Sequence, residues 1–189
     1  MRQLYFITGN KGKLSEIENR LKPFNIKIVQ KDLGYPEIQA DTLEDVAKYG
    51  VDHVKSMFVK PFILEDAGLF IDELKGFPGV YSKYVFYTVG LLNILKLMKN
   101  KKNRYAVFRS VYAFYDKNLK TNFFIGECHG EITTKIRGSA GFGYDPIFQP
   151  KDSKKTFAEM TIEEKNIYSH RGKALDKLVE FLIKNYDLS

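Results

Sequence analysis

Residues 4–13 read LYFITGNKGK, and the order of apolar, chain-breaking and basic residues in this stretch decides the fold. Leu4 to Ile7 form a short apolar run, which predicts a buried strand. Gly9-Asn10 interrupts the run, and a helix is expected from Lys13 to Lys22, with Pro23 just beyond its end. A strand that leads directly into a helix is the repeating unit of α/β proteins.

Strand and helix signals continue to alternate along the rest of the chain. They are expected at Ile26–Val29 (strand), Thr42–Phe58 (helix), Phe62–Leu64 with the extended Leu69–Ile71 (strands), Leu91–Met98 (helix), Tyr105–Tyr115 with Phe123–Ile125 (hairpin) and Ser169–Tyr186 (helix). We therefore predict one α/β domain over residues 1–189, with a mixed sheet flanked by helices and a long hairpin that forms a second lobe.

Composition excludes several classes of protein. Hydrophobic residues make up 44% and charged residues 28%, close to the globular average, which argues against a disordered chain. Cys128 is the single cysteine, and no apolar run is long enough for a signal sequence or a membrane span, so a cytoplasmic location is expected. The 30 basic and 23 acidic residues leave a net charge of +7, which favours an anionic partner without identifying it.

The turn Thr8-Gly9-Asn10-Lys11-Gly12-Lys13 joins the first strand to the first helix. Its two glycines permit close approach of a ligand to the backbone, and the helix N-terminus together with Lys13 would attract an anion. An ordinary turn with Asn10 as the N-cap explains the same residues. The spacing does not match a P-loop, so these two interpretations remain open.

Three further segments contain candidate site residues. Glu65-Asp66 follows the Phe62–Leu64 strand, and with Glu37 it would suit Mg²⁺, although a polar strand exit accounts for the pair equally well. Gly138 to Pro146 places glycines around two aromatic residues and Asp145, and either contacts a planar ligand or anchors a loop. Lys165 to Arg171 brings cations to the start of the last helix, where they either meet a ligand or face solvent.

The order of these segments is more specific than any one of them. Thr-Gly-Asn-x-x-Lys, Glu-Asp-x-Gly, Pro-Gly-x-Tyr-Ser at 78–82, Gly-Phe-Gly-Tyr-Asp-Pro-Ile-Phe at 141–148 and Glu-Lys-Asn-x-x-Ser-His-Arg-x-Lys-Ala-Leu at 164–175 together resemble the inosine triphosphate pyrophosphatase family. The resemblance covers Phe6 to about Leu178. It implies an elongated, twisted mixed sheet in two lobes with a central substrate cleft, usually in a homodimer.

The resemblance also implies an activity. Members of this family hydrolyse deaminated purine nucleoside triphosphates (ITP, dITP, XTP) to the monophosphate and pyrophosphate with Mg²⁺, which removes them from the nucleotide pool. Glu37 and Asp66 would hold Mg²⁺, and Asp66 would accept the proton. The expected substrate contacts are Thr8, Gly9, Asn10, Lys11, Gly12, Lys13, Ala67, Phe142, Gly143, Tyr144, Asp145, Lys165, His170 and Arg171.

Base choice should follow from hydrogen-bond chemistry. The C6 carbonyl of hypoxanthine and xanthine accepts, whereas the C6 amino group of adenine donates; Lys165 and Arg171 only donate, and His170 can donate. A pocket built from these donors should therefore prefer ITP over ATP.

Two departures from the family pattern affect this assignment. Ala67 stands where Ser is common, so a hydroxyl contact is lost. Many members carry a Lys near the position of Gly50, and Lys48 or Lys55 would have to replace it as a phosphate-binding cation.

Two rival functions are consistent with parts of the sequence. A nucleic-acid-binding module would use the charge and the aromatic hairpin at 104–125, but the positive charge is not clustered, so no nucleic-acid or membrane partner is predicted. A Maf-like pyrophosphatase acting on modified pyrimidine nucleotides is the second rival, and the donor-rich segment at 165–171 favours purines over it.

Overall fold

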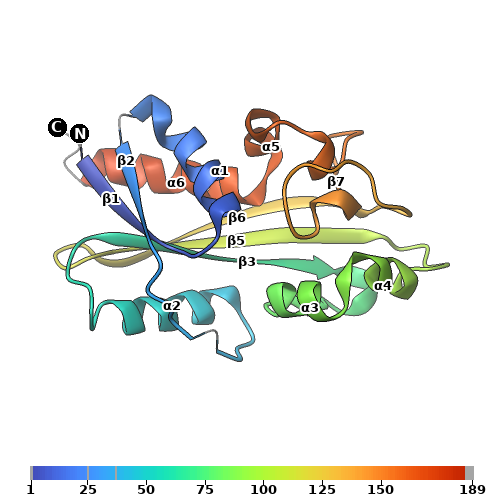
Figure 1. Cartoon of the computed structure of the whole chain (residues 1–189), viewed down its shortest axis with the longest axis horizontal. Helices are drawn as coiled ribbons and strands as arrows, with labels where there is room; N and C mark the ends of the chain where they lie inside the picture. Colours follow the sequence, from blue (N-terminus) through green and yellow to red (C-terminus); the bar gives the residue numbers. More distant parts are fainter. Residues whose placement is uncertain (1, 25, 37, 186–189) are drawn as a thin grey trace.

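One seven-stranded mixed sheet forms the centre of an elongated molecule, in a computed structural model that describes residues 2–24, 26–36 and 38–185 (Figure 1). The strand order is β2-β1-β3-β5-β6-β7, and β4 pairs with β3 outside this path. Helices cover both faces of the sheet, so the predicted α/β class with a mixed twisted sheet is confirmed.

The parallel part of the sheet comes from the N-terminal third of the chain. β1 (Arg2–Ile7) lies between β2 (Ile26–Lys31) and β3 (Phe62–Ile71) and is parallel to both. The two crossover helices, α1 (Lys11–Leu21) and α2 (Leu43–Val54), pack on opposite faces, as Figure 1 shows. The helix predicted over 42–58 is shorter in the structure, where it is α2, and α1 begins two residues earlier than predicted.

β3 is one continuous strand of ten residues, which corrects the prediction that Glu65-Asp66 lies beyond a strand end. Its first residues pair with β1 up to Ile7↔Leu64, and its whole length pairs antiparallel with β5. The strand continues through two acidic residues because β5 supplies the backbone partners and buried cations neutralise Glu65. Asp66 therefore lies just past the point where the parallel neighbour ends.

The antiparallel part runs through both lobes, because Tyr112 and Phe124 belong to the core of the first lobe and Phe108 and Ile132 to the core of the second. β5 (Tyr105–Asp116) and β6 (Lys120–Ile132) make the predicted hairpin, β7 (Phe148–Pro150) pairs with β6, and β4 (Pro78–Gly79) pairs with β3. The helix predicted over 91–98 is confirmed as α4 (Gly90–Leu97), but the sequence analysis missed α3 (Ser82–Thr88), which precedes it. Gly90, at a φ of +73°, separates the two helices.

The C-terminal region also contains two helices where one was predicted. α5 (Ile162–Tyr168) has Ser169 as its C-cap, and α6 (His170–Asn185) begins at the next residue. Tyr186, the expected last residue of the helix, lies outside the described residues. Short 3-10 helices complete the structure at Lys22–Phe24 (η1), Asp72–Leu74 (η2), Asp145–Ile147 (η3) and Phe157–Glu159 (η4).

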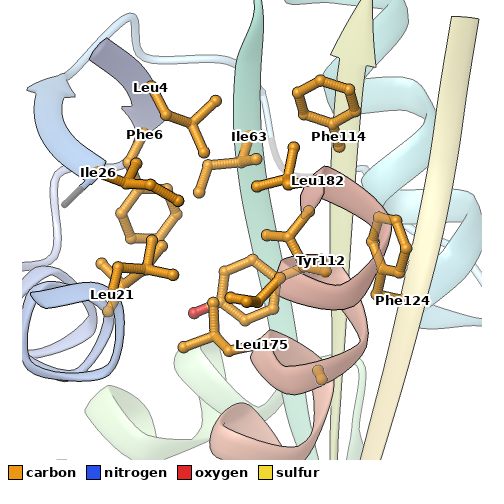
Figure 2. Close-up of a cluster of buried hydrophobic side chains, with 14 residues drawn as sticks. Leu4, Phe6, Leu21, Ile26, Ile63, Tyr112, Phe114, Phe124, Leu175 and Leu182 are labelled. Carbon is orange, nitrogen blue, oxygen red and sulfur yellow. The ribbon is translucent and has the colours of Figure 1, made fainter. Parts of the chain in front are cut away.

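Three apolar clusters form the cores of the two lobes. In the first lobe, one cluster joins β1 and α1 to α6, and another packs α2 against the opposite face of the sheet. Figure 2 shows the first of these, with Leu175 beside the ring of Tyr112 and Leu4 beside Ile63. The third cluster forms the core of the second lobe between α3, α4 and β7. In the described part of the chain, every helix is too short or too polar to cross a lipid bilayer.

Candidate active site

A cleft of about 800 Å³ opens where the two lobes meet. It is lined by segments far apart in the sequence: the β1–α1 turn, the middle of β3, helix α3, the loop before η3, and the first turn of α6. The predicted residues that line it are Thr8, Gly9, Asn10, Lys11, Gly12, Lys13, Asp66, Ala67, Phe142, Gly143, Tyr144, Asp145, His170 and Arg171. The fold therefore brings into one site segments that lie far apart in the sequence.

The β1–α1 turn closes one end of the cleft. Asn10 accepts a hydrogen bond from the Lys13 backbone N–H at 3.1 Å, so it is the N-cap of α1, as one of the two interpretations proposed. A Cβ on Gly9 would lie 2.6 Å from Asp32, and one on Gly12 would lie 2.5 Å from the Phe142 ring. The Phe142 ring leaves no room for a side chain at Gly12, whereas the exposed Asp32 carboxylate near Gly9 can rotate away.

A buried carboxylate organises the cations of the cleft. Glu65 Oε2 lies 2.7 Å from Lys13 Nζ, which also donates to the Glu65 carbonyl at 2.9 Å. Arg171 Nε and Ser110 Oγ both donate to Glu65 Oε1, at 3.0 and 2.7 Å. Burial alone would raise the pKa of Glu65, but the charges of Arg171 and Lys13 outweigh it and hold this pKa at about 2.

Asp66 lines the cleft beside Ala67, and alternation along β3 directs its side chain to the opposite face from Glu65. Glu37, the other predicted metal ligand, lies outside the described residues. No three His, Cys, Asp or Glu side chains gather closely enough to hold a metal ion in the segments 2–24, 26–36 and 38–185. Mg²⁺ commonly binds proteins through one or two carboxylates together with substrate phosphates, so the donor chemistry of Asp66 fits this ion.

Aromatic rings and His170 form another part of the cleft wall. His170 stacks on Phe108 with ring centroids 4.6 Å apart and an interplanar angle of 6°. Burial, together with the charge of Arg171, lowers the pKa of His170 well below its usual value, so the imidazole is neutral at pH 7. Neither ring nitrogen has a hydrogen-bond partner among the described residues, and both are buried.

Phe142 and Asp145 line the cleft and both contact Lys165. The Phe142 backbone N–H donates to Asp145 Oδ2 at 2.8 Å, and Lys165 Nζ lies 2.6 Å from the same oxygen. Lys165 is the only predicted contact in the described part of the chain that does not line the cleft, because it is buried behind the Phe142 ring. Tyr144 is fixed by its hydroxyl, which donates to the Ser82 carbonyl at 2.8 Å.

The suggestion that Lys48 or Lys55 replaces the family's missing lysine is wrong. Both pair with Asp52 on the surface of α2, and neither lines the cleft. The α3 residue Lys83 lines the cleft instead. Because the sequence analysis missed α3, it had no reason to place a cation there.

Glu16 is the other residue that the sequence analysis missed. Glu18 on the same helix is exposed, whereas Glu16 is 3% exposed. Its carboxylate lies 2.6 Å from Lys165 and 2.8 Å from Arg171. Its neighbours on the helix surface, Gly12, Lys13, Asn19 and Arg20, are not apolar, so local sequence carried no signal of its burial.

The mixed sheet, the two lobes and the cleft between them define an α/β enzyme. A family comparison then identifies it: the chain belongs to the Ham1 family, whose model matches residues 4–181.

Individual relatives and structures agree with this result. The chain is 54% identical to a dITP/XTP pyrophosphatase of Pyrococcus horikoshii, over 97% of this chain and 98% of the relative. It is 50% identical to a dITP/XTP pyrophosphatase of Thermococcus kodakarensis, with the same coverage. The structure of the Staphylococcus aureus Ham1 protein superposes with a TM-score of 0.83 and 27% identity, over 97% of this chain and 99% of the other.

Proposed function

We propose that this enzyme, a nucleoside triphosphate pyrophosphatase by family membership, hydrolyses deaminated purine nucleoside triphosphates (ITP, dITP and XTP) to the monophosphate and pyrophosphate. One observation carries the proposal: a single cleft joins an N-capped glycine turn, the Asp66 carboxylate and a pocket built from aromatic rings and a neutral histidine. These three parts suit a triphosphate, the site of bond cleavage and a purine base, in that order.

The triphosphate would lie against the turn 8–13. The first N–H groups of α1 and the positive end of its dipole face the cleft there. Lys13 Nζ donates a hydrogen bond to the Glu65 carbonyl and forms an ion pair with Glu65 Oε2, and the three protons of its ammonium allow a further contact with a phosphate oxygen. Lys83, which lines the cleft from α3, adds positive charge.

Asp66 would accept the proton of the attacking water. Among the described residues, Asp66 is also the one best suited to hold Mg²⁺ through its carboxylate. When bound, this ion would spread the charge that develops on the phosphate oxygens. Glu65 is unsuited to either task, because two cations and Ser110 occupy its carboxylate. The chemistry needs positioned charges more than a covalent nucleophile, as in other phosphoryl transfers.

His170 is the donor best placed to recognise the base. Lys165 and Arg171 direct their protons to Glu16, Asp145 and Glu65, whereas neutral His170 lines the cleft with one N–H to donate. A donor at this position satisfies the C6 carbonyl of hypoxanthine or xanthine and opposes the C6 amino group of adenine. The preference for ITP over ATP should therefore exceed what shape alone gives, roughly 10–200-fold.

A substrate panel tests the proposal. ITP, XTP, dITP, GTP, ATP and modified pyrimidine triphosphates are each incubated with enzyme and Mg²⁺, and released pyrophosphate is measured. The deaminated purines should be the best substrates, and ¹⁸O from labelled water should enter the monophosphate. Orthophosphate and a diphosphate as first products would refute the reaction, and preference for modified pyrimidines would favour the Maf-like alternative.

The cytoplasmic location, the homodimer and the lack of a nucleic-acid partner stay predictions. Sedimentation velocity measures the mass in solution, and a monomer across micromolar concentrations would contradict pairing. Oligonucleotide binding with a steep salt dependence would indicate the nucleic-acid function that we do not expect.

A further inference from the structure

Six charged side chains form an unbroken alternating row beside the cleft. Each is within 3.0 Å of the next, and three carboxylates balance three cations. The row runs Lys13, Glu65, Arg171, Glu16, Lys165, Asp145. It begins on the turn that we assign to the triphosphate and ends on the loop that holds Phe142.

Glu16 occupies the middle of this row. Each carboxylate oxygen contacts a different cation: Oε1 lies 2.6 Å from Lys165 Nζ, and Oε2 lies 2.8 Å from Arg171 Nη1. All three residues are at most 4% exposed. Burial alone would raise the pKa of Glu16, but the charges of Arg171 and Lys165 hold it below its usual value. Without this anion the two buried cations would lose the carboxylate between them.

The two cations in turn support Phe142. Lys165 Nζ lies 4.8 Å from the centroid of the Phe142 ring, and the Arg171 guanidinium carbon lies 5.1 Å from it. Lys165 also holds Asp145, which accepts the Phe142 backbone N–H. Glu16 does not line the cleft, so any effect on the ligand must pass through these neighbours.

We propose that Glu16 is a positioning residue for base discrimination: it fixes Lys165 and Arg171, and through them the Phe142 ring and the first turn of α6 that carries His170. The inference rests on the proposed function, because it names what sets the ITP preference of that cleft. A residue that only stabilised the fold would change the amount of active enzyme and leave the ratio of two substrates unchanged.

The decisive variant is Glu16→Gln, with Glu18→Gln as its control on the same helix. Both remove one negative charge from α1, but Glu18 is exposed. kcat/KM is measured for ITP and for ATP, and thermal unfolding is followed in parallel. We expect the ITP/ATP ratio to fall on the order of tenfold to a hundredfold in Glu16→Gln, because displacements of about 1 Å have effects of this size. Glu18→Gln should keep the wild-type ratio.

Other outcomes overturn the inference without affecting the proposed function. A folded Glu16→Gln variant with the wild-type ITP/ATP ratio would reduce Glu16 to a structural ion pair. If that variant fails to fold, Glu16→Asp keeps the charge with a shorter reach, and an unchanged ratio there would have the same meaning. Failure of the wild-type enzyme to prefer ITP would instead refute the proposed function.

A double-mutant cycle tests the route. If Glu16 acts through Lys165, then Glu16→Gln with Lys165→Met should lower the ratio by less than the product of the two single effects. Multiplicative effects would contradict the connection.

Discussion

Asp66 and Glu65 are adjacent carboxylates on β3 with opposite environments. Both line the cleft, but the Glu65 carboxylate is buried and contacts Lys13, Arg171 and Ser110, whereas Asp66 is half-buried. Replacing Asp66 by Asn keeps the shape and removes the proton acceptor, a loss that typically costs on the order of 10²–10⁴ in rate. We expect kcat for ITP to fall by at least this amount at saturating Mg²⁺.

Asp32→Asn is the matched control, because Asp32 is a second carboxylate of the same cleft and is exposed. It should retain most of the activity. Asp66→Asn activity within a few-fold of wild type would show that another group accepts the proton.

His170→Ala tests recognition of the base at a single residue. Removing the imidazole takes away the N–H donor that faces the cleft, so kcat/KM should fall for ITP and change little for ATP. His53→Ala, on the surface of α2 beside Tyr49, serves as the control. Equal losses for the two nucleotides would mean that His170 supports the site without reading the base.

Individual site residues were largely predictable from the sequence, but their partners were not. Asn10, Asp66 and His170 belong to short motifs whose order is specific. Glu16 is not part of any quoted motif, and its partners Lys165 and Arg171 lie about 150 residues away. A charge on a mostly polar helix looks solvated until the partner segment is placed.

At the scale of elements, Gly126 permits the contact between β6 and α6. A Cβ there would lie 2.1 Å from the His170 carbonyl oxygen and 2.5 Å from the Ala174 nitrogen. Gly126→Ala should therefore displace the first turn of α6, with a loss of about 1–3 kcal/mol in the free energy of unfolding. Denaturant unfolding measures this loss, and kcat/KM for ITP should fall as well, because that turn carries His170 and Arg171. Unchanged stability would show that α6 shifts without strain.

The elements that the sequence analysis missed have identifiable reasons. α3 is rich in aromatic and β-branched residues, which are weak helix formers, so it carried no helical signal. α5 did carry one: Thr161 and Glu164 form a capping box, the Thr-x-x-Glu pattern that marks a helix start. β3 seemed to end at its acidic pair because neutralisation by cations from α1 and α6 cannot be seen in local sequence.

At the scale of the whole molecule, the row of buried charges should make stability depend on acid. The pKa of Glu65 is about 2 in the folded protein, below its model-peptide value of 4.5. A depressed carboxyl pKa contributes stability that is complete above the unfolded-state value and is lost as pH falls towards the folded-state value. We expect the free energy of unfolding to decrease between pH 4.5 and 2, by roughly 3 kcal/mol from this residue.

Glu65→Gln checks the origin of that loss. The variant should be less stable at pH 7, since two buried cations lose their shared carboxylate, and its stability should change less between pH 4.5 and 2. Urea unfolding at several pH values measures both effects, with Glu18→Gln as the exposed control. An acid dependence in Glu65→Gln equal to that of wild type would assign it to other carboxylates.

The apolar cluster that joins β1 to α6 can form only after the ribosome has synthesised the C-terminal helix. Leu4 and Phe6 are covered by Leu175 and Leu178, roughly 170 residues later in the chain. At about 5–20 residues per second, a ribosome needs roughly 10–30 s to deliver that cover. During this interval the nascent N-terminal strands expose an apolar face that the finished fold covers, so the risk of aggregation is concentrated in synthesis.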